Sequence, residues 1–241
     1  MQPELVQQGE DLILPSSDPA VTIAKGYRRY LVGFDIAQSA TTVDANAFAI
    51  IQDERIPHWT EYAQELGPRR RTVVRAERVP AMSYTELGVV VRNLMRQEPL
   101  ATAGYLVVDS SGVGRAFSDL LLARSVQHTR MQITSGEGES EAKERGVTFN
   151  NVSKSLLLNS MNSALHVGDL KIGNFPLRNE LQRELESFSV KHSDTGRSTF
   201  SGGTKAGHAD IAMSVAMALW LSDHRTVGAH VGETRLKGYW D

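Results

Sequence analysis

The chain has 241 residues, of which 41% are apolar and 22% are charged, a composition typical of one globular domain of ordinary to large size. It contains no cysteine, which excludes disulfides, thiolate zinc sites and cysteine nucleophiles. The net charge of −2 excludes a protein that grips nucleic acid through its overall charge. No apolar run approaches the length of a membrane span, and the N-terminus is polar and acidic, so we expect a soluble, intracellular protein.

The first part of the chain predicts three strands. Residues 1–27 show weak periodicity, and we interpret them as a lead-in or the remnant of a linker. Apolar runs over residues 30–34 and 45–51 predict two paired strands. Alternation of apolar and polar residues over 72–79 predicts a third strand beside them.

Helices and strands then alternate. The capping box Ser83-Tyr84-Thr85-Glu86 predicts the start of a helix. A buried strand is expected over residues 104–108, and a helix should begin at Gly112-Val113-Gly114. A fifth strand is expected over residues 131–134. The acidic, polar segment 136–146 is interpreted as an exposed loop.

The last third of the chain predicts three helices, a short strand and a hairpin. In chain order these are a helix over 157–165, an extended piece at 170–172, a helix from Pro176, a hairpin around 194–196 and a helix over 208–221. The final helix is apolar nearly all round and should be buried. This order favours one α/β domain at residues 28–225, with an RNase H-like mixed central sheet, helices on both faces and a C-terminal tail at 226–241.

Three aspartates stand at informative positions of these elements. Asp35 follows the first strand, Asp109 follows the fourth, and Asp210 lies in the first turn of the last helix. Ligands of open α/β sheets bind beyond the carboxyl ends of strands, and a helix N-terminus favours an ionised carboxylate. Each aspartate alone is more often a turn or cap residue. If the two strands are neighbours and the helix docks across them, the three acids converge.

Converging carboxylates repel one another and need a cation. Hard oxygen ligands select Mg²⁺ or Mn²⁺, and two such ions can activate a water and stabilise the leaving oxygen of a phosphodiester. If Asp35, Asp109 and Asp210 converge, they form an acidic cluster suited to this chemistry, which needs no cysteine and no serine nucleophile.

Three segments resemble the nuclease domain of phage large terminase subunits, in the RNase H-like superfamily. They are Leu31-Val32-Gly33-Phe34-Asp35-Ile36-Ala37-Gln38-Ser39, Val107-Val108-Asp109-Ser110-Ser111-Gly112-Val113-Gly114, and Gly207-His208-Ala209-Asp210-Ile211-Ala212-Met213-Ser214-Val215-Ala216-Met217-Ala218. The ordered set spans about residues 30–222, and each motif alone is weak. Many family members have a second acid where this chain has Ala209.

The resemblance implies an endonuclease that cleaves double-stranded DNA during genome packaging, with two Mg²⁺ or Mn²⁺ ions at Asp35, Asp109 and Asp210. It also implies an ATPase motor domain or subunit, a small terminase and a portal as partners, in the host cell cytoplasm and with no membrane. Because no Walker motif is present, we expect an excised domain or the product of a split gene.

Basic residues are candidates for contacts with DNA phosphates. The candidates are Arg69, Arg70, Arg71, Lys154, Arg197 and Lys205. The arginine triplet is the strongest of these, and Lys205 follows because it is close to Asp210 in the sequence, although most such charges are simply solvated.

Three alternatives remain open on the sequence. Another RNase H-like enzyme, such as a Holliday-junction resolvase or a transposase, would share the acids and the metals. Sugar kinases and actin-like ATPases share this sheet but need two such domains, and this chain is too short for that. A docking domain of the same fold would have no catalytic activity.

Overall fold

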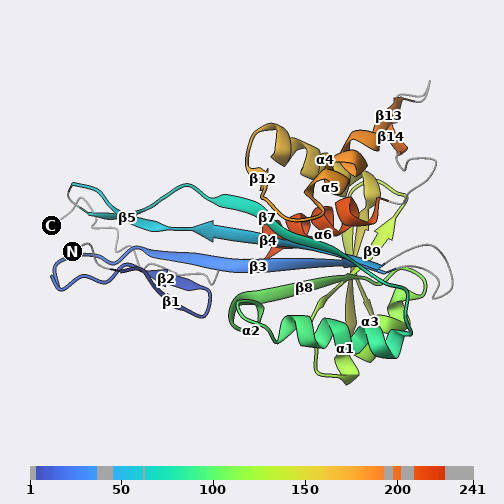
Figure 1. Cartoon of the computed structure of the whole chain (residues 1–241), viewed down its shortest axis with the longest axis horizontal. Helices are drawn as coiled ribbons and strands as arrows, with labels where there is room; N and C mark the ends of the chain where they lie inside the picture. Colours follow the sequence, from blue (N-terminus) through green and yellow to red (C-terminus); the bar gives the residue numbers. More distant parts are fainter. Residues whose placement is uncertain (1–3, 37–45, 62, 193–197, 202–208, 226–241) are drawn as a thin grey trace, which may run out of the picture.

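The computed structural model describes residues 4–36, 46–61, 63–192, 198–201 and 209–225, and it is built on one mixed sheet with helices on both faces (Figure 1). The strands are β1 (Val6–Gln8), β2 (Asp11–Ile13), β3 (Lys25–Asp35), β4 (Asn46–Arg55), β5 (Pro57–Trp59), β6 (Gln64–Leu66), β7 (Arg70–Val79), β8 (Gly104–Asp109), β9 (Thr129–Thr134), β10 (Glu139–Glu144), β11 (Val147–Ser153), β12 (Leu170–Ile172), β13 (Ser189–His192) and β14 (Ser198–Ser201).

The main sheet has the strand order β10-β11-β9-β8-β3-β4-β7-β12, with β2 against β3 and β1 against β2. The central pairs β3–β4 and β4–β7 are antiparallel, whereas β3–β8, β8–β9, β9–β11 and β7–β12 are parallel. Two further hairpins, β5–β6 and β13–β14, form separate two-stranded sheets. The expected mixed α/β sheet is confirmed.

Six helices of the described residues cover the two faces of the sheet. They are α1 (Tyr84–Met95), α2 (Leu100–Ala103), α3 (Gly114–Ala123), α4 (Lys154–His166), α5 (Arg178–Ser187) and α6 (Asp210–His224). One core lies between the sheet and α1 and α3, and the other between the sheet and α4, α5 and α6. Within the described part of the chain, no helix is both long and apolar enough to cross a membrane.

The expected strands over 30–34, 45–51, 72–79 and 104–108 correspond to β3, β4, β7 and β8. The capping box at Ser83 is formed, because its side chain accepts a hydrogen bond from the Glu86 amide and the Glu86 carboxylate accepts from the Ser83 amide. The local signals were sufficient here because three of the strands contain buried apolar runs, and β7 alternates between buried and more exposed positions.

One expected loop is wrong. Residues 136–146, interpreted as an exposed loop, contain β10, which forms an antiparallel hairpin with β11. The strand lies at the edge of the sheet and is almost wholly exposed. Charged side chains suit an unpaired strand edge, and its hydrogen bonds come from β11. Polarity therefore reflected the edge position and not a loop.

The segment expected to be a lead-in contributes to the sheet. Within residues 1–27, β1 and β2 form a hairpin that pairs with the beginning of β3, and Leu12 and Leu14 are buried. The domain boundary at residue 27 stays a prediction. The expected tail at 226–241 and the turn at 194–196 lie outside the described residues.

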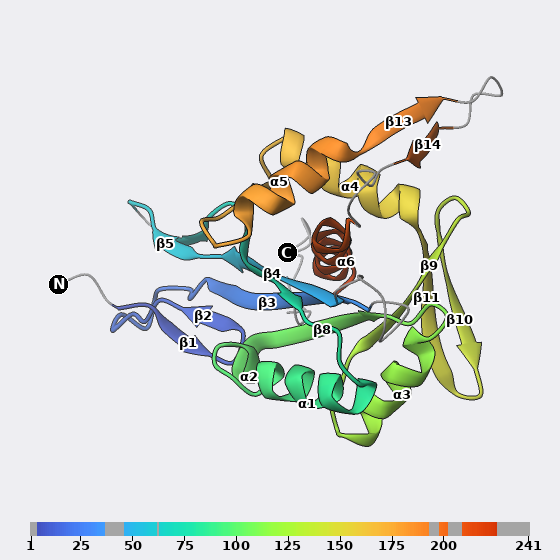
Figure 2. The same cartoon turned by 45° about the vertical axis from the view of Figure 1, so that its right-hand side comes forward.

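Helix α6 lies close against the centre of the sheet. Figure 2 views it nearly along its axis, with β3 and β4 on one side and α4 and α5 on the other. A Cβ atom on Gly33 would lie 2.0 Å from the Ser214 carbonyl oxygen, so only glycine permits this approach. The Ser214 hydroxyl donates to the Ala47 carbonyl at 3.1 Å. The helix is thus held directly over β3 and β4.

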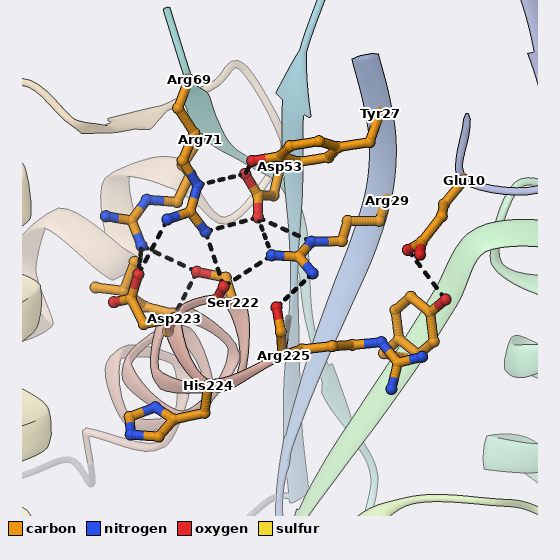
Figure 3. A network of polar contacts seen from close by, with 12 residues as sticks. Glu10, Tyr27, Arg29, Asp53, Arg69, Arg71, Ser222, Asp223, His224 and Arg225 are labelled. Carbon is orange, nitrogen blue, oxygen red and sulfur yellow. Dashed lines mark hydrogen bonds and ion pairs between the residues drawn. The ribbon is translucent and has the colours of Figure 1, made fainter. Parts of the chain in front are cut away.

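The C-terminal end of α6 is held by the buried Arg29 and the partly exposed Arg69 (Figure 3). The Arg29 guanidinium donates to the carbonyls of Ser222 and Arg225, at 2.8 and 2.7 Å, and Arg69 donates to the same Ser222 carbonyl at 2.8 Å. Asp53, which has no exposed surface, accepts hydrogen bonds from both arginines. Cations at this end suit the helix dipole and satisfy carbonyls that no helical amide can reach.

Candidate metal centre

The first two predicted acids end neighbouring parallel strands. Strand β3 pairs with β8 so that Phe34 lies opposite Val108, which brings Asp35 and Asp109 to the same edge of the sheet. The Asp109 carboxylate accepts a hydrogen bond from the Ser111 amide at 2.8 Å. Directly behind it, a Cβ on Gly114 would lie 2.2 Å from the Asp109 carbonyl oxygen. The glycine therefore lets α3 begin immediately beside this acid.

The third predicted acid approaches this edge from a different element. Asp210 is the first residue of α6, the helix that packs on β3 and β4. Burial raises the pKa of Asp35 well above its usual value, and the charges of Asp109 and Asp210 raise it further. Burial also raises the pKa of Asp109, against hydrogen bonds from Ser111 that lower it. The charges of Asp109 and Asp210 therefore both act on the Asp35 carboxylate.

Three residues that the sequence did not single out join this cluster. Arg78, near the end of β7, donates to Asp210 at 2.9 Å, to Glu180 at 2.5 Å and to Glu184 at 2.6 Å. Both glutamates come from α5. Glu184 carried a usable signal, because it lies three residues after the buried Leu181 on the apolar stripe of the helix. Arg78 offered no such signal before its partners were known.

Glu184 also caps α6. The residue before Asp210 is Ala209, which has no side chain able to accept a hydrogen bond from the first turn. The Glu184 carboxylate accepts from the Ala212 amide at 2.8 Å in its place. Burial raises the pKa of Glu184 to about 7, although the Ala212 amide and Arg78 lower it. Glu184, from α5, therefore supplies at the N-terminus of α6 the capping carboxylate that Ala209 lacks.

The basic residues named from the sequence fall into four groups. Lys154 begins α4, and its charge lowers the pKa of Asp35, so it belongs to the acidic site. Arg69 and Arg71 are held in ion pairs, Arg69 with Asp53 and Arg71 with Asp169 and Asp223. Arg70 is exposed. Arg197 and Lys205 lie outside the described residues.

The arginine triplet lies far from the acids. Arg70 is opposite Glu54 on β4, and Glu54 is opposite Arg28 on β3. Arg28 precedes Asp35 by seven positions on the same strand, which corresponds to about 23 Å at the rise of a strand. The triplet and the acids therefore occupy opposite ends of the sheet.

The acids fit a divalent cation by chemistry. Five carboxylates, those of Asp35, Asp109, Asp210, Glu180 and Glu184, face two cations, Arg78 and Lys154. Carboxylate oxygens are the donors that Mg²⁺ and Mn²⁺ prefer. In the conformation described, no three acidic or histidine side chains of the described residues are close enough to share one ion.

Comparison with known proteins gives structural neighbours only. No family model matches the chain, and no curated protein matches it. The large terminase nuclease of thermophilic phage G20c has a TM-score of 0.53 and 17% identity, over 93% of this chain and 94% of that chain. It has also been solved with bound magnesium.

Two other phage proteins are similar. A variant nuclease domain of the large terminase subunit gp2 of bacterial virus Sf6, solved with manganese and beta-thujaplicinol, has a TM-score of 0.56 and 14% identity, over 83% of this chain and 89% of that chain. The large terminase of another thermophilic bacteriophage has a TM-score of 0.51 and 11% identity, over 81% of this chain and 40% of that chain. The chain has the fold of large terminase nuclease domains. The predicted resemblance is confirmed at the level of this fold.

The raised pKa of Glu184 predicts a pH-dependent stability. Its protonated form favours the folded state, so this contribution is fully present below its usual pKa near 4.5 and is lost as pH rises through about 7. With EDTA present, the unfolding free energy of the protein should fall between about pH 5 and about pH 8 by about 2–3 kcal/mol more than that of Glu184→Gln. Urea denaturation at both pH values measures this difference.

Glu186→Gln is the matched control, since Glu186 lies on the same helix and is exposed. It should keep the pH dependence of the unmodified protein. An equal pH dependence in Glu184→Gln would mean that Glu184 is not the titrating group.

Proposed function

We propose that the chain is a metal-dependent endonuclease that cleaves double-stranded DNA, as the nuclease domain of a phage large terminase subunit. The observation that carries this proposal is the convergence of Asp35, Asp109 and Asp210, from two adjacent strand ends and one helix start, in the terminase nuclease fold. Asp35, Asp109 and Asp210 would be the ligands of two Mg²⁺ or Mn²⁺ ions.

The residues of the chain have separable roles in this proposal. Asp35 and Asp109 are carried by strands buried in the sheet, so their positions are fixed before any ion binds. Asp210 is fixed through α6, which is anchored on Gly33 and at its arginine-capped end. When bound, the ions would activate the attacking water and stabilise the leaving oxygen of the phosphodiester. Two structural neighbours were solved with magnesium and with manganese, which supports this choice of ions.

The proposed context is genome packaging. One structural neighbour is a large terminase of which the match occupies 40%, which supports a motor domain or subunit as a partner of this chain. A small terminase and a portal are proposed as further partners, in the cytoplasm of an infected host. Sequence-tolerant cleavage would suit this context, because the acids would act on the phosphodiester itself.

Asp35→Asn, Asp109→Asn and Asp210→Asn should each reduce cleavage at least about 100-fold, because each removes a charged ligand. The metal-free Asp35→Asn and Asp109→Asn proteins should be as stable as the unmodified chain or more so, because a repelling charge is lost, whereas Asp210→Asn also loses its ion pair with Arg78. A supercoiled-plasmid assay with Mg²⁺, Mn²⁺ or EDTA measures the activity, and thermal unfolding in EDTA measures the stability.

Asp18→Asn is the control for these changes, because Asp18 is exposed in an N-terminal turn. It should cleave like the unmodified chain. Plasmid that stays intact in both metals at every protein concentration would rule out independent endonuclease activity.

We further propose that phosphate contacts come from the accessible basic residues, Arg70 and Lys154, together with Arg197 and Lys205. Arg69 and Arg71 are predicted candidates too, but their ion pairs make substitution there a test of stability as well. The separation of about 23 Å along the strand direction between the level of Arg70 and that of Asp35 corresponds to about seven base-pair steps of duplex DNA. A duplex lying along the sheet would reach both.

Arg70→Ala and Lys154→Ala should each make the slope of log affinity against log salt less negative by about 0.9, because each removes one phosphate contact. Fluorescence anisotropy with a labelled duplex in Ca²⁺ or EDTA measures the slope. Arg96→Ala is the control, since Arg96 is exposed at the end of α1, and it should leave the slope unchanged. Unchanged slopes in both test variants would show that Arg70 and Lys154 are solvated and make no contact with DNA phosphates.

A further inference from the structure

The arginine at the acidic site makes three ion pairs at once. Each nitrogen of the Arg78 guanidinium has its own carboxylate: Nε contacts Glu180, Nη2 contacts Glu184 and Nη1 contacts Asp210, at 2.5, 2.6 and 2.9 Å. The three partners come from two helices, whereas Arg78 comes from the sheet. Such a fork of charge-assisted hydrogen bonds fixes the geometry of all three acids.

The register of the sheet places Arg78 beside the predicted metal ligands. Asp35 is opposite Ala47, and Ala47 is opposite Arg78, so these backbone positions lie level on three neighbouring strands. Two strand spacings correspond to about 10 Å between the Cα atoms of Asp35 and Arg78. The long arginine side chain covers part of this distance to reach Asp210 at the start of α6.

The arginine is therefore a cation within a cluster whose acids outnumber its bases. Its side chain is 28% exposed, so it is not sealed in and can change partners. The two α5 glutamates can retain the guanidinium if Asp210 releases it, since Glu184 is nearly buried and Glu180 contacts Nε. The contacts of Arg78 with Glu180 and Glu184 can thus persist when its contact with Asp210, the predicted metal ligand, is released.

We propose that Arg78 is a positioning residue that holds Asp210 in the metal-free protein and competes with the divalent cation for its carboxylate. This inference rests on the proposed function, because it assumes that Asp210 is a metal ligand. In the metal-free protein, Arg78 keeps the start of α6 joined to α5 and β7. When a cation binds, Asp210 turns to it, and Arg78 remains with Glu180 and Glu184.

Competition and mere structural support predict opposite effects on metal affinity. If Arg78 only supported the fold, its loss would loosen the acids and weaken metal binding. If Arg78 competes for Asp210, its loss removes both the rival hydrogen bond and a nearby positive charge, so the metal should bind more tightly.

The test measures Mn²⁺ binding to the intact chain without DNA, by the electron paramagnetic resonance signal of free Mn²⁺. Arg78→Gln should bind Mn²⁺ about tenfold more tightly than the unmodified chain. This factor is the effect expected when one competing charged hydrogen bond to Asp210 is lost. In EDTA the same variant should melt at a lower temperature, and Mn²⁺ should raise its melting temperature more than that of the unmodified chain. Arg78→Lys keeps the positive charge but not the forked guanidinium. Its Mn²⁺ affinity and its melting temperature should lie between those of Arg78→Gln and the unmodified chain.

Arg75→Gln is the matched control. Arg75 lies on the same strand and pairs only with its neighbour Glu77 among the ion pairs of the described residues, and its side chain is 44% exposed. It should leave both Mn²⁺ affinity and melting temperature unchanged. If Arg78→Gln does not fold, the Nη1 signals of Arg78 can be followed in the unmodified chain by NMR during Mg²⁺ titration, and they should shift with the occupancy of the metal because Nη1 contacts Asp210.

The outcomes separate this inference from the proposed function. Mn²⁺ binding that is lost in Asp35→Asn but unchanged or weakened in Arg78→Gln overturns the competition and leaves the metal site standing. Nη1 signals that stay unchanged at Mg²⁺ concentrations where the unmodified chain binds the metal do the same. If neither the unmodified chain nor Arg78→Gln binds Mn²⁺, both the proposed function and this inference are overturned.

Discussion

The close seating of α6 on β3 is the contact on which the site depends. Gly33 has no Cβ, so the backbone of α6 approaches to a distance that any side chain would prevent. The Ser214 hydroxyl bond to the Ala47 carbonyl holds the same part of the helix to β4. Because Asp210 begins this helix and Asp35 ends β3, a change in the seating of α6 would change the separation of the acids. The packing of an apolar helix thus sets the geometry of a charged site.

The two ends of α6 have opposite electrostatic surroundings, and both agree with its dipole. Carboxylates gather at the N-terminal end, where Glu184 accepts from the Ala212 amide, and guanidinium groups of Arg29 and Arg69 cap the carbonyls at the C-terminal end. Asp53, which has no exposed surface, forms ion pairs with both arginines. Buried networks of this kind are costly to break, because a lone buried charge remains. The structural arginines and the acidic site are therefore joined through one helix.

Much of this arrangement was predictable from the sequence, and the remainder depended on distant partners. Asp35 and Asp109 follow buried apolar runs, so the sequence predicted both strand ends and their aspartates. Strand β10 was missed because it lies at the exposed edge of the sheet, where its residues are charged and form no apolar pattern. Arg78 was missed because its partner Glu184 is 106 residues away in the sequence. The apolar stripe of α5 indicated a buried position for Glu184, but its role depends on the Ala212 amide, which is 28 residues away. No local pattern distinguishes a strand arginine with three acidic partners from a solvated one.

The central claim is that Asp35, Asp109 and Asp210 form one divalent-metal site at the edge of the sheet. The most direct test is a crystal structure of the protein grown or soaked in Mn²⁺, with an anomalous difference map collected to locate the ions. We predict anomalous peaks within coordination distance, about 2.0–2.2 Å, of the carboxylate oxygens of these three residues. A map at saturating Mn²⁺ that has no peak at these carboxylates would contradict the claim.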